Sequence, residues 1–179
     1  NKNKEMDVMD IVKSRSNTVI ALKLQYNNTT RPFWVLNFHM PCVWRQPKVM
    51  EIYSIILQRF IKSITNNGSD PCIFLGDFNS KPTSNQYEIL TNGLENIDKK
   101  NFLNEYPNFI KCEKFLKLRS AYKEVYNEEP ICTNYSYCDF NGDFKGTIDY
   151  IFISNKITVN GMEKIIDPET YLPNDNCPS

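Results

Sequence analysis

The residues that most constrain this chain are CIFLGDFNSKP, at positions 72–82. The short apolar run 72–75 is rich in strand-forming residues and predicts a buried strand. It leads directly into a turn-like sequence in which Asp77 and Asn79 flank Phe78. Glycine and aspartate are common in tight turns, because glycine adopts unusual backbone angles and aspartate hydrogen-bonds its own backbone. The same residues would also place two polar side chains at the end of a core strand, where α/β proteins often bind ligands.

The surrounding hydrophobic pattern predicts an α/β fold. Residues 19–26 alternate apolar and polar side chains and residues 32–40 are strongly apolar, which together indicate a β-hairpin. Apolar residues then recur at steps of three and four from Pro47 to about residue 66, as in an amphipathic helix opened by proline. Further expected elements are a strand at 71–75, a short helix at 84–91, an irregular or helical insertion at 95–117, a core strand at 147–154 and another strand within 156–166.

Composition limits the classes of function. The chain has 179 residues with 21 basic and 21 acidic side chains, so its formal net charge is zero. Proteins that coat long nucleic acids depend on an excess of Lys and Arg, and this balance argues against them while allowing an enzyme that binds a few nucleotides. No run approaches the roughly 20 apolar residues that cross a bilayer, so we expect no membrane partner. The length predicts one domain.

The cysteine pattern favours buried, reduced thiols over a disulfide framework or a zinc site. The cysteines lie far apart and form no Cys-x-x-Cys pair. An intracellular compartment is the corresponding expectation, with the cytoplasm first and mitochondria or nucleus as alternatives. The cysteines are Cys42, Cys72, Cys112, Cys132, Cys138 and Cys177.

Polar residues interrupt or end three otherwise apolar strands. They are His39 in LNFHMP, Asp77 with Asn79 in LGDFN, and Asp149 in TIDYIF. An unpaired buried carboxylate costs several kcal/mol, so each acidic residue needs a partner. His39 alone is expected to be a hydrogen-bonded core histidine, and Asp149 alone fits a structural or a catalytic role equally. Together they predict a ligand site at strand ends, whose oxygen and amide groups suit Mg²⁺ or Mn²⁺ and a phosphate-bearing substrate.

Three motifs in this order resemble the endonuclease/exonuclease/phosphatase superfamily. They are Asn-x-His at 37–39, Gly-Asp-Phe-Asn at 76–79 and Ile-Asp-Tyr-Ile-Phe at 148–152. Residues 78–82 and 132–152 further resemble the carbon catabolite repressor type deadenylases and the related 2′-phosphodiesterases and nocturnin. The resemblance implies a DNase I-like four-layer α/β sandwich, with two mixed sheets flanked by helices, and Mg²⁺-dependent hydrolysis of phosphoesters.

The resemblance also implies roles for the residues of the motifs. Asp77 would orient or deprotonate the attacking water, and Asn79 would hold the scissile phosphate and contact the adenine or sugar. His39 would donate a hydrogen bond to the phosphate, and Asp149 would orient a catalytic histidine. Phe144 matches an aromatic residue that stacks on the terminal base. Asn37 and Lys145 complete the expected substrate-binding set, although Lys145 alone is more simply a solvated lysine, and Phe144 alone a loop aromatic that covers the core.

The motifs match only the later part of the family's catalytic domain. We therefore expect residues 1–179 to be the C-terminal part of one such domain, truncated at both ends. The family's principal metal ligand, a Glu on an early strand, and its final Ser-Asp-His triplet would then lie outside this chain. Asp77 is the remaining candidate metal ligand, to a second ion or through water. MPCVWRQPKVM, at 40–50, departs from the deadenylase pattern in a segment expected to line the base pocket.

Three functions follow as hypotheses. The first is a Mg²⁺-dependent exoribonuclease that removes adenylate from RNA 3′ ends and releases 5′-AMP, with poly(A) and deadenylase-complex subunits as partners. The second is a 2′-phosphodiesterase or a nucleotide 2′-phosphatase of the nocturnin kind. The third is a catalytically incomplete binding module.

Overall fold

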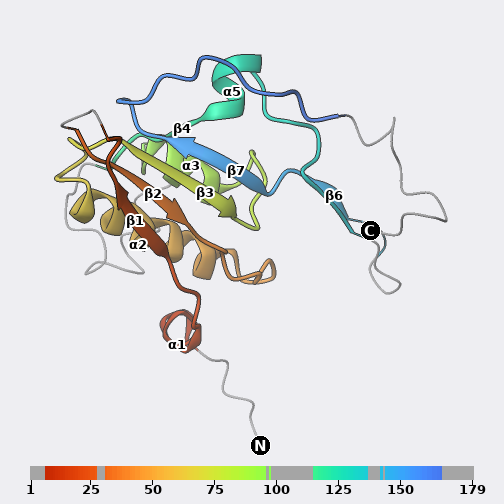
Figure 1. Cartoon of the computed structure of the whole chain (residues 1–179). Coiled ribbons are helices and arrows are strands. Elements are labelled where there is room, and N and C mark those ends of the chain that lie inside the picture. The colour runs from red at the N-terminus through yellow and green to blue at the C-terminus, as the bar shows by residue number, and fades with distance from the viewer. Residues whose placement is uncertain are drawn as a thin grey trace, which may run out of the picture.

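A computed structural model describes residues 7–27, 31–95, 97, 115–136, 142 and 144–166. The described part of the chain contains both helices and strands, as Figure 1 shows. In order they are α1 (Val8–Ser14), β1 (Ile20–Leu24), β2 (Phe33–Asn37), α2 (Pro47–Ile64), β3 (Cys72–Asp77), α3 (Asn85–Asn92), β4 (Arg119–Ser120), α5 (Ala121–Tyr126), β5 (Asn134–Ser136), β6 (Phe144–Gly146) and β7 (Asp149–Ile153).

The sheet topology brings three chain segments to one edge. A five-stranded sheet has the order β1-β2-β3-β7-β4, and β5 pairs with β6 in a separate ribbon. Strands β2 and β3 are parallel and therefore end at the same edge. Strand β7 is antiparallel to β3 and begins at that edge, so that Asp149 lies directly opposite Asp77. The sheet thus gathers at one place the strand ends on which the sequence motifs lie.

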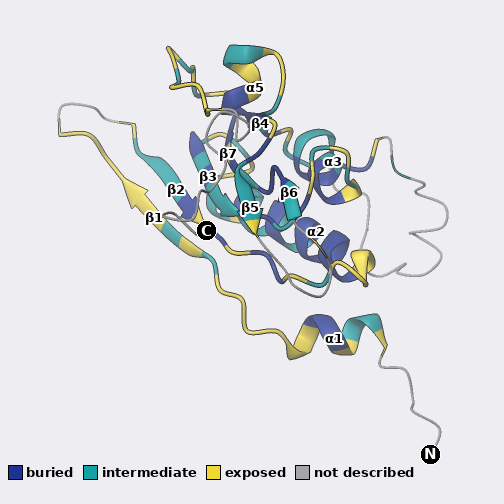
Figure 2. Cartoon of the chain, turned by 90° about the vertical axis from the view of Figure 1, so that its right-hand side faces the viewer, coloured by how far each residue is buried: buried dark blue, intermediate teal, exposed yellow. Residues whose placement is uncertain are grey.

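Helices α2 and α3 cover one face of this sheet. Helix α2 begins with Pro47 in its first turn and ends at Ile64, shortly before Asn66 and Asn67 adopt positive φ angles. Ser84 caps α3 by accepting a hydrogen bond from the backbone N–H of Tyr87. Figure 2 shows both helices on the same side of the sheet, with their buried faces turned toward it. Periodicity correctly predicted α2, and the capping and turn residues correctly predicted α3 and the ends of both helices.

The core beneath the helices is built on aromatic rings. Phe78 is fully buried, and its ring centroid lies 4.9 Å from that of Phe74 and 5.0 Å from that of Phe152. Both pairs are edge-to-face, which is the favoured geometry for aromatic rings. The Tyr150 ring adds a further contact at 6.0 Å. Phe78 therefore packs away from the polar residues beside it, as the alternation of the sequence suggests.

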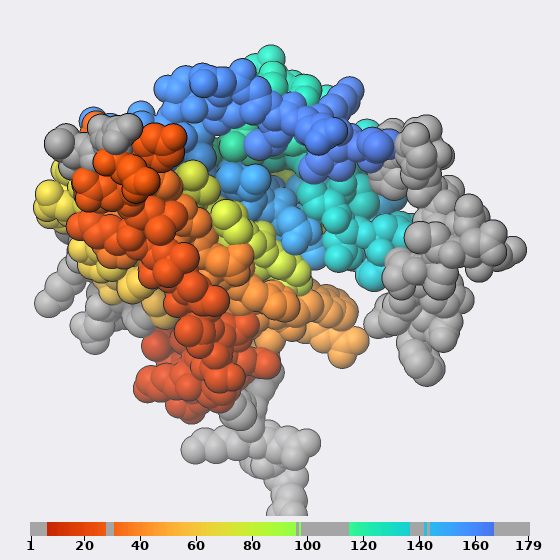
Figure 3. Space-filling model, in the orientation of Figure 1, coloured from red at the N-terminus to blue at the C-terminus, as the bar shows by residue number. Residues whose placement is uncertain are grey.

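The opposite face of the sheet is apolar and largely uncovered at β1. Ile20 and Leu22 on β1 and Ile151 on β7 are 60%, 53% and 43% exposed. Figure 3 shows the atoms of β1, β2, β3 and β7 side by side on this face. The α/β class is confirmed, and the described residues supply one large mixed sheet with α2 and α3 on one face. No helix in the described part of the chain is long and apolar enough to cross a membrane.

The strand predicted within residues 156–166 is wrong. The described residues there form no strand, and the strand that pairs with the last two residues of β7 on its outer side is β4. Side chains hold this segment instead: the Arg119 guanidinium donates to the carbonyl of Ile157, and the Tyr126 hydroxyl donates to that of Met162. Neither β4 nor α5 was predicted. Most of the segment expected at 95–117 lies outside the described residues.

The described cysteines are free, and two of the three are buried, namely Cys72 and Cys132. Burial raises the pKa of the Cys72 thiol to about 11, which keeps it protonated and unreactive. Cys42 is exposed, contrary to the expectation of buried thiols. The remaining three cysteines lie outside the described residues.

Gly76 permits the close approach of β2 and β3 at the edge where the motifs meet. Its φ is 140°, and a Cβ placed on it would lie 1.9 Å from the carbonyl oxygen of Phe38. We expect Gly76→Ala to lower the free energy of unfolding by at least the roughly 1–3 kcal/mol that backbone strain alone costs. Urea-induced unfolding measures this, with Gly161→Ala as the control because a Cβ there meets no atom within 4 Å. Equal stabilities of the two variants would contradict this account of the sheet edge.

Candidate active site

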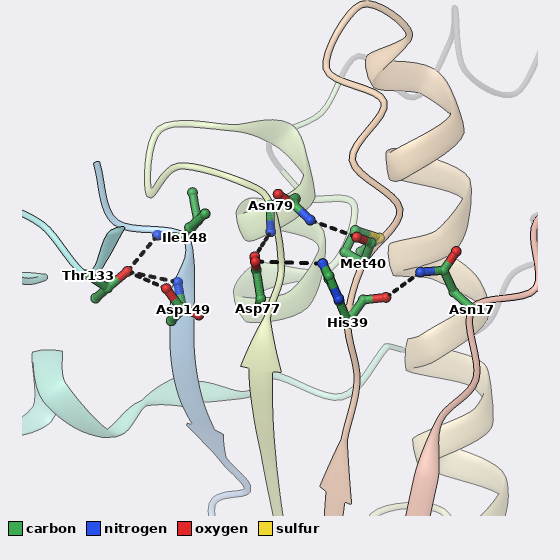
Figure 4. Close-up of polar contacts among 8 residues, drawn as sticks. All are labelled: Asn17, His39, Met40, Asp77, Asn79, Thr133, Ile148 and Asp149. Atoms are coloured by element: carbon green, nitrogen blue, oxygen red, sulfur yellow. Dashed lines mark hydrogen bonds and ion pairs between the residues drawn. The ribbon is translucent and has the colours of Figure 1, made fainter. Parts of the chain in front are cut away.

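Asp77 and Asn79 are fixed by a tight turn at the end of β3. The backbone N–H of Asn79 donates to Asp77 Oδ1 at 2.7 Å, and Asn79 has a positive φ of 48°, which asparagine tolerates well. Asn79 Nδ2 donates to the carbonyl of Met40 at 2.7 Å, which ties the turn to the loop after β2. Figure 4 shows these contacts at the tips of the strands. The turn is thus both a local motif and a link between two strand ends.

His39 lies beside Asp77 at the surface. Its Nε2 is 3.7 Å from Asp77 Oδ2, and the side chains of His39 and Asp77 are 71% and 28% exposed. The carbonyl of His39 accepts a hydrogen bond from Asn17 Nδ2. An exposed pair at this distance stabilises a fold by at most about 1 kcal/mol. The sequence expectation of a core histidine is therefore wrong, and the His39 imidazole is accessible to a ligand.

Asp149 is held by Thr133, which is not among the predicted site residues. Thr133 Oγ1 donates to Asp149 Oδ2 at 2.8 Å and accepts the backbone N–H groups of Ile148 and Asp149, each at 3.0 Å. The hydroxyl thus uses both its donor and its acceptor capacity to fix the start of β7. Only the proximity of residues 132–136 to β7 in space reveals this contact, because the two are far apart along the chain.

The electrostatic environment raises the pKa of Asp77 above its usual value. Burial is the largest cause, and the negative charge of Asp149 acts in the same direction. The hydrogen bond from the Asn79 backbone and the neighbouring His39 lower the pKa and offset part of this rise. A carboxylate with a raised pKa is a better proton acceptor than an ordinary surface aspartate, so Asp77 is the best-placed general base among the described residues.

The described residues do not complete a metal site on their own. No group of three His, Cys, Asp or Glu side chains in the described ranges is arranged to hold an ion. Asp77 Oδ1 already accepts the Asn79 N–H, and Asp149 Oδ2 accepts the Thr133 hydroxyl. The Asp77 and Asp149 carboxylates suit a divalent cation but make up only part of a ligand set. We therefore assign no catalytic step to a metal bound by these residues.

Two cavities meet at Asp77. A cavity of about 460 Å³ lies on the open face of the sheet and is bordered by Leu75, Asp149 and Ile151. A larger groove of about 740 Å³ lies on the other side, a volume typical of small-ligand sites. Asp77 lines both. Residues that line the groove include Cys42, Trp44, Asn79, Ser80, Lys81, Asn134, Ser136 and Phe144.

Only some of the predicted substrate-binding residues line this groove. Phe144 lines it together with Asn79. Lys145 follows Phe144 on strand β6 and therefore points to the opposite face of that strand. Asn37 is the exposed last residue of β2, in register with Leu75. Neither Lys145 nor Asn37 lines the groove, whereas Lys81, which was not predicted, does.

Comparison with known proteins assigns the chain to a family. Residues 9–179 match the family described as endonuclease/exonuclease/phosphatase. The chain belongs to this family. The probable CCR4-Not complex 3′-5′-exoribonuclease subunit Ccr4 of Vairimorpha ceranae is 26% identical over 183 residues, which cover 99% of this chain and 36% of that protein. The 2′,5′-phosphodiesterase 12 of Homo sapiens is 34% identical over 113 residues, 61% of this chain and 17% of that protein.

Solved structures show the same fold. The catalytic domain of human nocturnin with bound sulfate superposes with a TM-score of 0.53 at 22% identity, over 78% of this chain and 42% of that one. The DNase I-like fold class is thereby confirmed for this member of the family. The chain spans little more than a third of the length of the first relative above, and less of the second.

Replacement of Thr133 tests its role in holding β7. Thr133→Val would leave two backbone N–H groups and the Asp149 carboxylate without their partner, whereas Thr133→Ser keeps the hydroxyl. An unsatisfied buried group costs about 1–3 kcal/mol, and these hydrogen bonds are part-buried, so we expect the valine variant to be less stable than the serine variant by about this amount in total. Urea-induced unfolding measures the difference, and equal stability would show that the hydroxyl is not needed.

The raised pKa of Asp77 gives stability a defined pH dependence. Below about pH 3.9, the usual aspartate pKa, the carboxyl is protonated in the folded and unfolded states alike, and it exerts no penalty. As pH rises through the higher folded-state pKa, the buried negative charge increasingly opposes folding. We therefore expect Asp77→Asn to be more stable than the wild type at neutral pH, with the advantage vanishing at low pH.

Unfolding free energies measured at several pH values test this expectation. The control is Glu163→Gln, which removes an exposed carboxylate. If the advantage of Asp77→Asn did not change with pH, burial of the charge would not be the cause.

Proposed function

We propose that the protein hydrolyses phosphodiester bonds at RNA 3′ ends, prefers adenylate and releases 5′-AMP. The observation that carries the proposal is the Asp77–Asn79 turn, which places a basic carboxylate and an amide beside a groove lined by Phe144. One relative is named as a 3′-5′-exoribonuclease, which supports the same reaction. Partners in a deadenylase complex and a cytoplasmic location belong to this proposal.

Each side chain has a task that its contacts allow. Asp77 accepts the proton of the attacking water, as its raised pKa permits. Asn79 Nδ2 is bound to Met40 through one hydrogen, which leaves a second hydrogen for a phosphate oxygen and Oδ1 for a sugar hydroxyl or base amine. His39 is exposed beside Asp77 and donates to the phosphate as negative charge develops.

Asp149 is a positioning residue and does not itself touch the substrate in this proposal. Its carboxylate is fixed by Thr133 and lies on the strand adjacent to Asp77, from which it can orient a neighbouring group and raise the basicity of Asp77. The resemblance implies a divalent cation, Mg²⁺ or Mn²⁺, held mainly by residues outside those described. Phe144 supplies an aromatic surface on which the terminal base stacks, worth about 1–3 kcal/mol.

A second candidate function is hydrolysis of 2′-linked phosphoesters. The similarity to a 2′,5′-phosphodiesterase favours it, and so does the altered segment at 40–50, which contributes Cys42 and Trp44 to the groove. A binding module without catalysis is the third candidate, because the described residues do not complete a metal site. Substrates of different linkage separate these three candidates.

The decisive experiment gives the full-length protein 5′-labelled RNA with an adenylate tail, RNA with a cytidylate tail, and 2′,5′-linked oligoadenylate. Each is incubated with Mg²⁺ or with chelator. We expect stepwise shortening of the adenylate tail alone, abolished by chelator. We expect Asp77→Asn to lower kcat by about 10²–10⁴-fold, the usual contribution of a general base, with Glu163→Gln unchanged.

Other outcomes have defined meanings. Cleavage confined to the 2′,5′-linked substrate would replace the first candidate by the second. Full activity of Asp77→Asn would remove Asp77 from the mechanism. Binding of RNA without cleavage of any substrate would support the binding module.

A further inference from the structure

The groove carries a second aromatic side chain on the segment that departs from the deadenylase pattern. Trp44 is 64% exposed and lines the groove, as Phe144 does from strand β6. The Arg45 guanidinium lies 4.7 Å from the centroid of the Trp44 ring, a cation–π distance. The groove thus carries two aromatic residues from separate parts of the chain, and one of them is accompanied by a positive charge.

Lys81 brings a further positive charge to the groove. Its Nζ lies 5.5 Å from the centroid of the Phe144 ring. Both side chains lie over Gly146, where a Cβ would be 3.2 Å from Phe144 Cζ and 3.5 Å from Lys81 Cε. The Phe144 ring and the Lys81 stem therefore pack together above Gly146, which holds the ammonium group near the ring.

The groove also contains a polar group without a hydrogen-bond partner in the described part of the chain. Ser80 is 5% exposed and lines the groove, and its Oγ has no hydrogen bond among the described residues. A buried hydroxyl without a partner costs about 1–3 kcal/mol. Ser80 therefore adds an unpaired hydroxyl to the polar groups beside the groove.

We propose that this groove holds a second nucleotide next to the terminal one, with its base stacked on Trp44 and its phosphate paired with Lys81. Aromatic side chains interleaved with cations are the usual means of binding single strands, because every base offers a π-face and every linkage a negative charge. The inference rests on the proposed function and narrows its substrate class. The preferred substrate is a single strand of two or more nucleotides, and a mononucleotide occupies only part of the site.

Binding measured in the presence of chelator tests the subsite without catalysis. The full-length protein binds a fluorescein-labelled adenylate hexanucleotide, which is displaced by unlabelled AMP, the dinucleotide or the tetranucleotide. We expect the dinucleotide and the tetranucleotide to compete at least tenfold better than AMP. We expect Trp44→Ala to weaken both about 5- to 150-fold, the equivalent of one stacked base, and to leave AMP unchanged. Trp44→Phe should retain most of the affinity.

Two further variants separate the contributions of the aromatic ring and the charge. Lys81→Gln should weaken the longer strands and reduce the slope of log affinity against log salt by about 0.7, the value for one phosphate contact on a single strand. Lys81→Arg should keep the slope. Trp34→Phe is the matched control for the Trp44 variants. Trp34 also has a lysine near its ring, with Lys23 Nζ 5.5 Å from the ring centroid, but Trp34 lies outside the groove.

The outcomes distinguish this inference from the proposed function. If AMP competes as well as the tetranucleotide, or if Trp44→Ala weakens both equally, the second subsite is absent while nucleotide binding stands. If length-dependent binding is present but no phosphoester is cleaved, the subsite stands and the proposed catalysis fails. If neither AMP nor any adenylate strand binds, both proposals are wrong.

Discussion

The burial of the Phe78 ring is the interaction on which the candidate site depends. With its side chain packed edge-to-face between Phe74 and Phe152, the backbone must turn so that the flanking Asp77 and Asn79 face outward. Such aromatic pairs contribute about 0.5–1.5 kcal/mol each beyond their burial. The turn is then closed by the Asn79 N–H on the Asp77 carboxylate. Hydrophobic burial thus holds a polar pair in one geometry at the surface.

The mixed sheet converts this local turn into a site. Parallel pairing of β2 with β3 places His39 beside Asp77, and antiparallel pairing of β3 with β7 places Asp149 opposite it. An all-parallel order would have sent the start of β7 to the far edge, away from both. Burial of Asp77 at this junction is the largest cause of its raised pKa, and the like charge of Asp149 on the antiparallel neighbour raises the pKa further, so the carboxylate gains basicity.

Asp77 also lies between two cavities whose lining residues differ in chemistry. The cavity on the open face is bordered by Leu75 and Ile151, whereas the groove on the helix side gathers aromatic, cationic and hydroxyl groups. A phosphoester reaction needs both a reacting group at the boundary and a surface that positions the rest of the substrate. In the proposed function the groove is that surface, and its lining residues come from the loop after β2, the turn after β3, the β5–β6 ribbon and helices α2 and α3.

The sequence by itself determined the α/β class, the two covering helices and the identity of Asp77, Asn79 and Asp149 as the polar ends of core strands. These follow from periodicity and from the cost of burying charge, which are local properties. Tertiary structure alone decided that Thr133 holds Asp149, that residues 156–166 form no strand, and that Lys81 rather than Lys145 lines the groove. Each depends on which distant segment occupies a strand edge or a strand face, and contacts between distant segments leave no periodic trace along the chain.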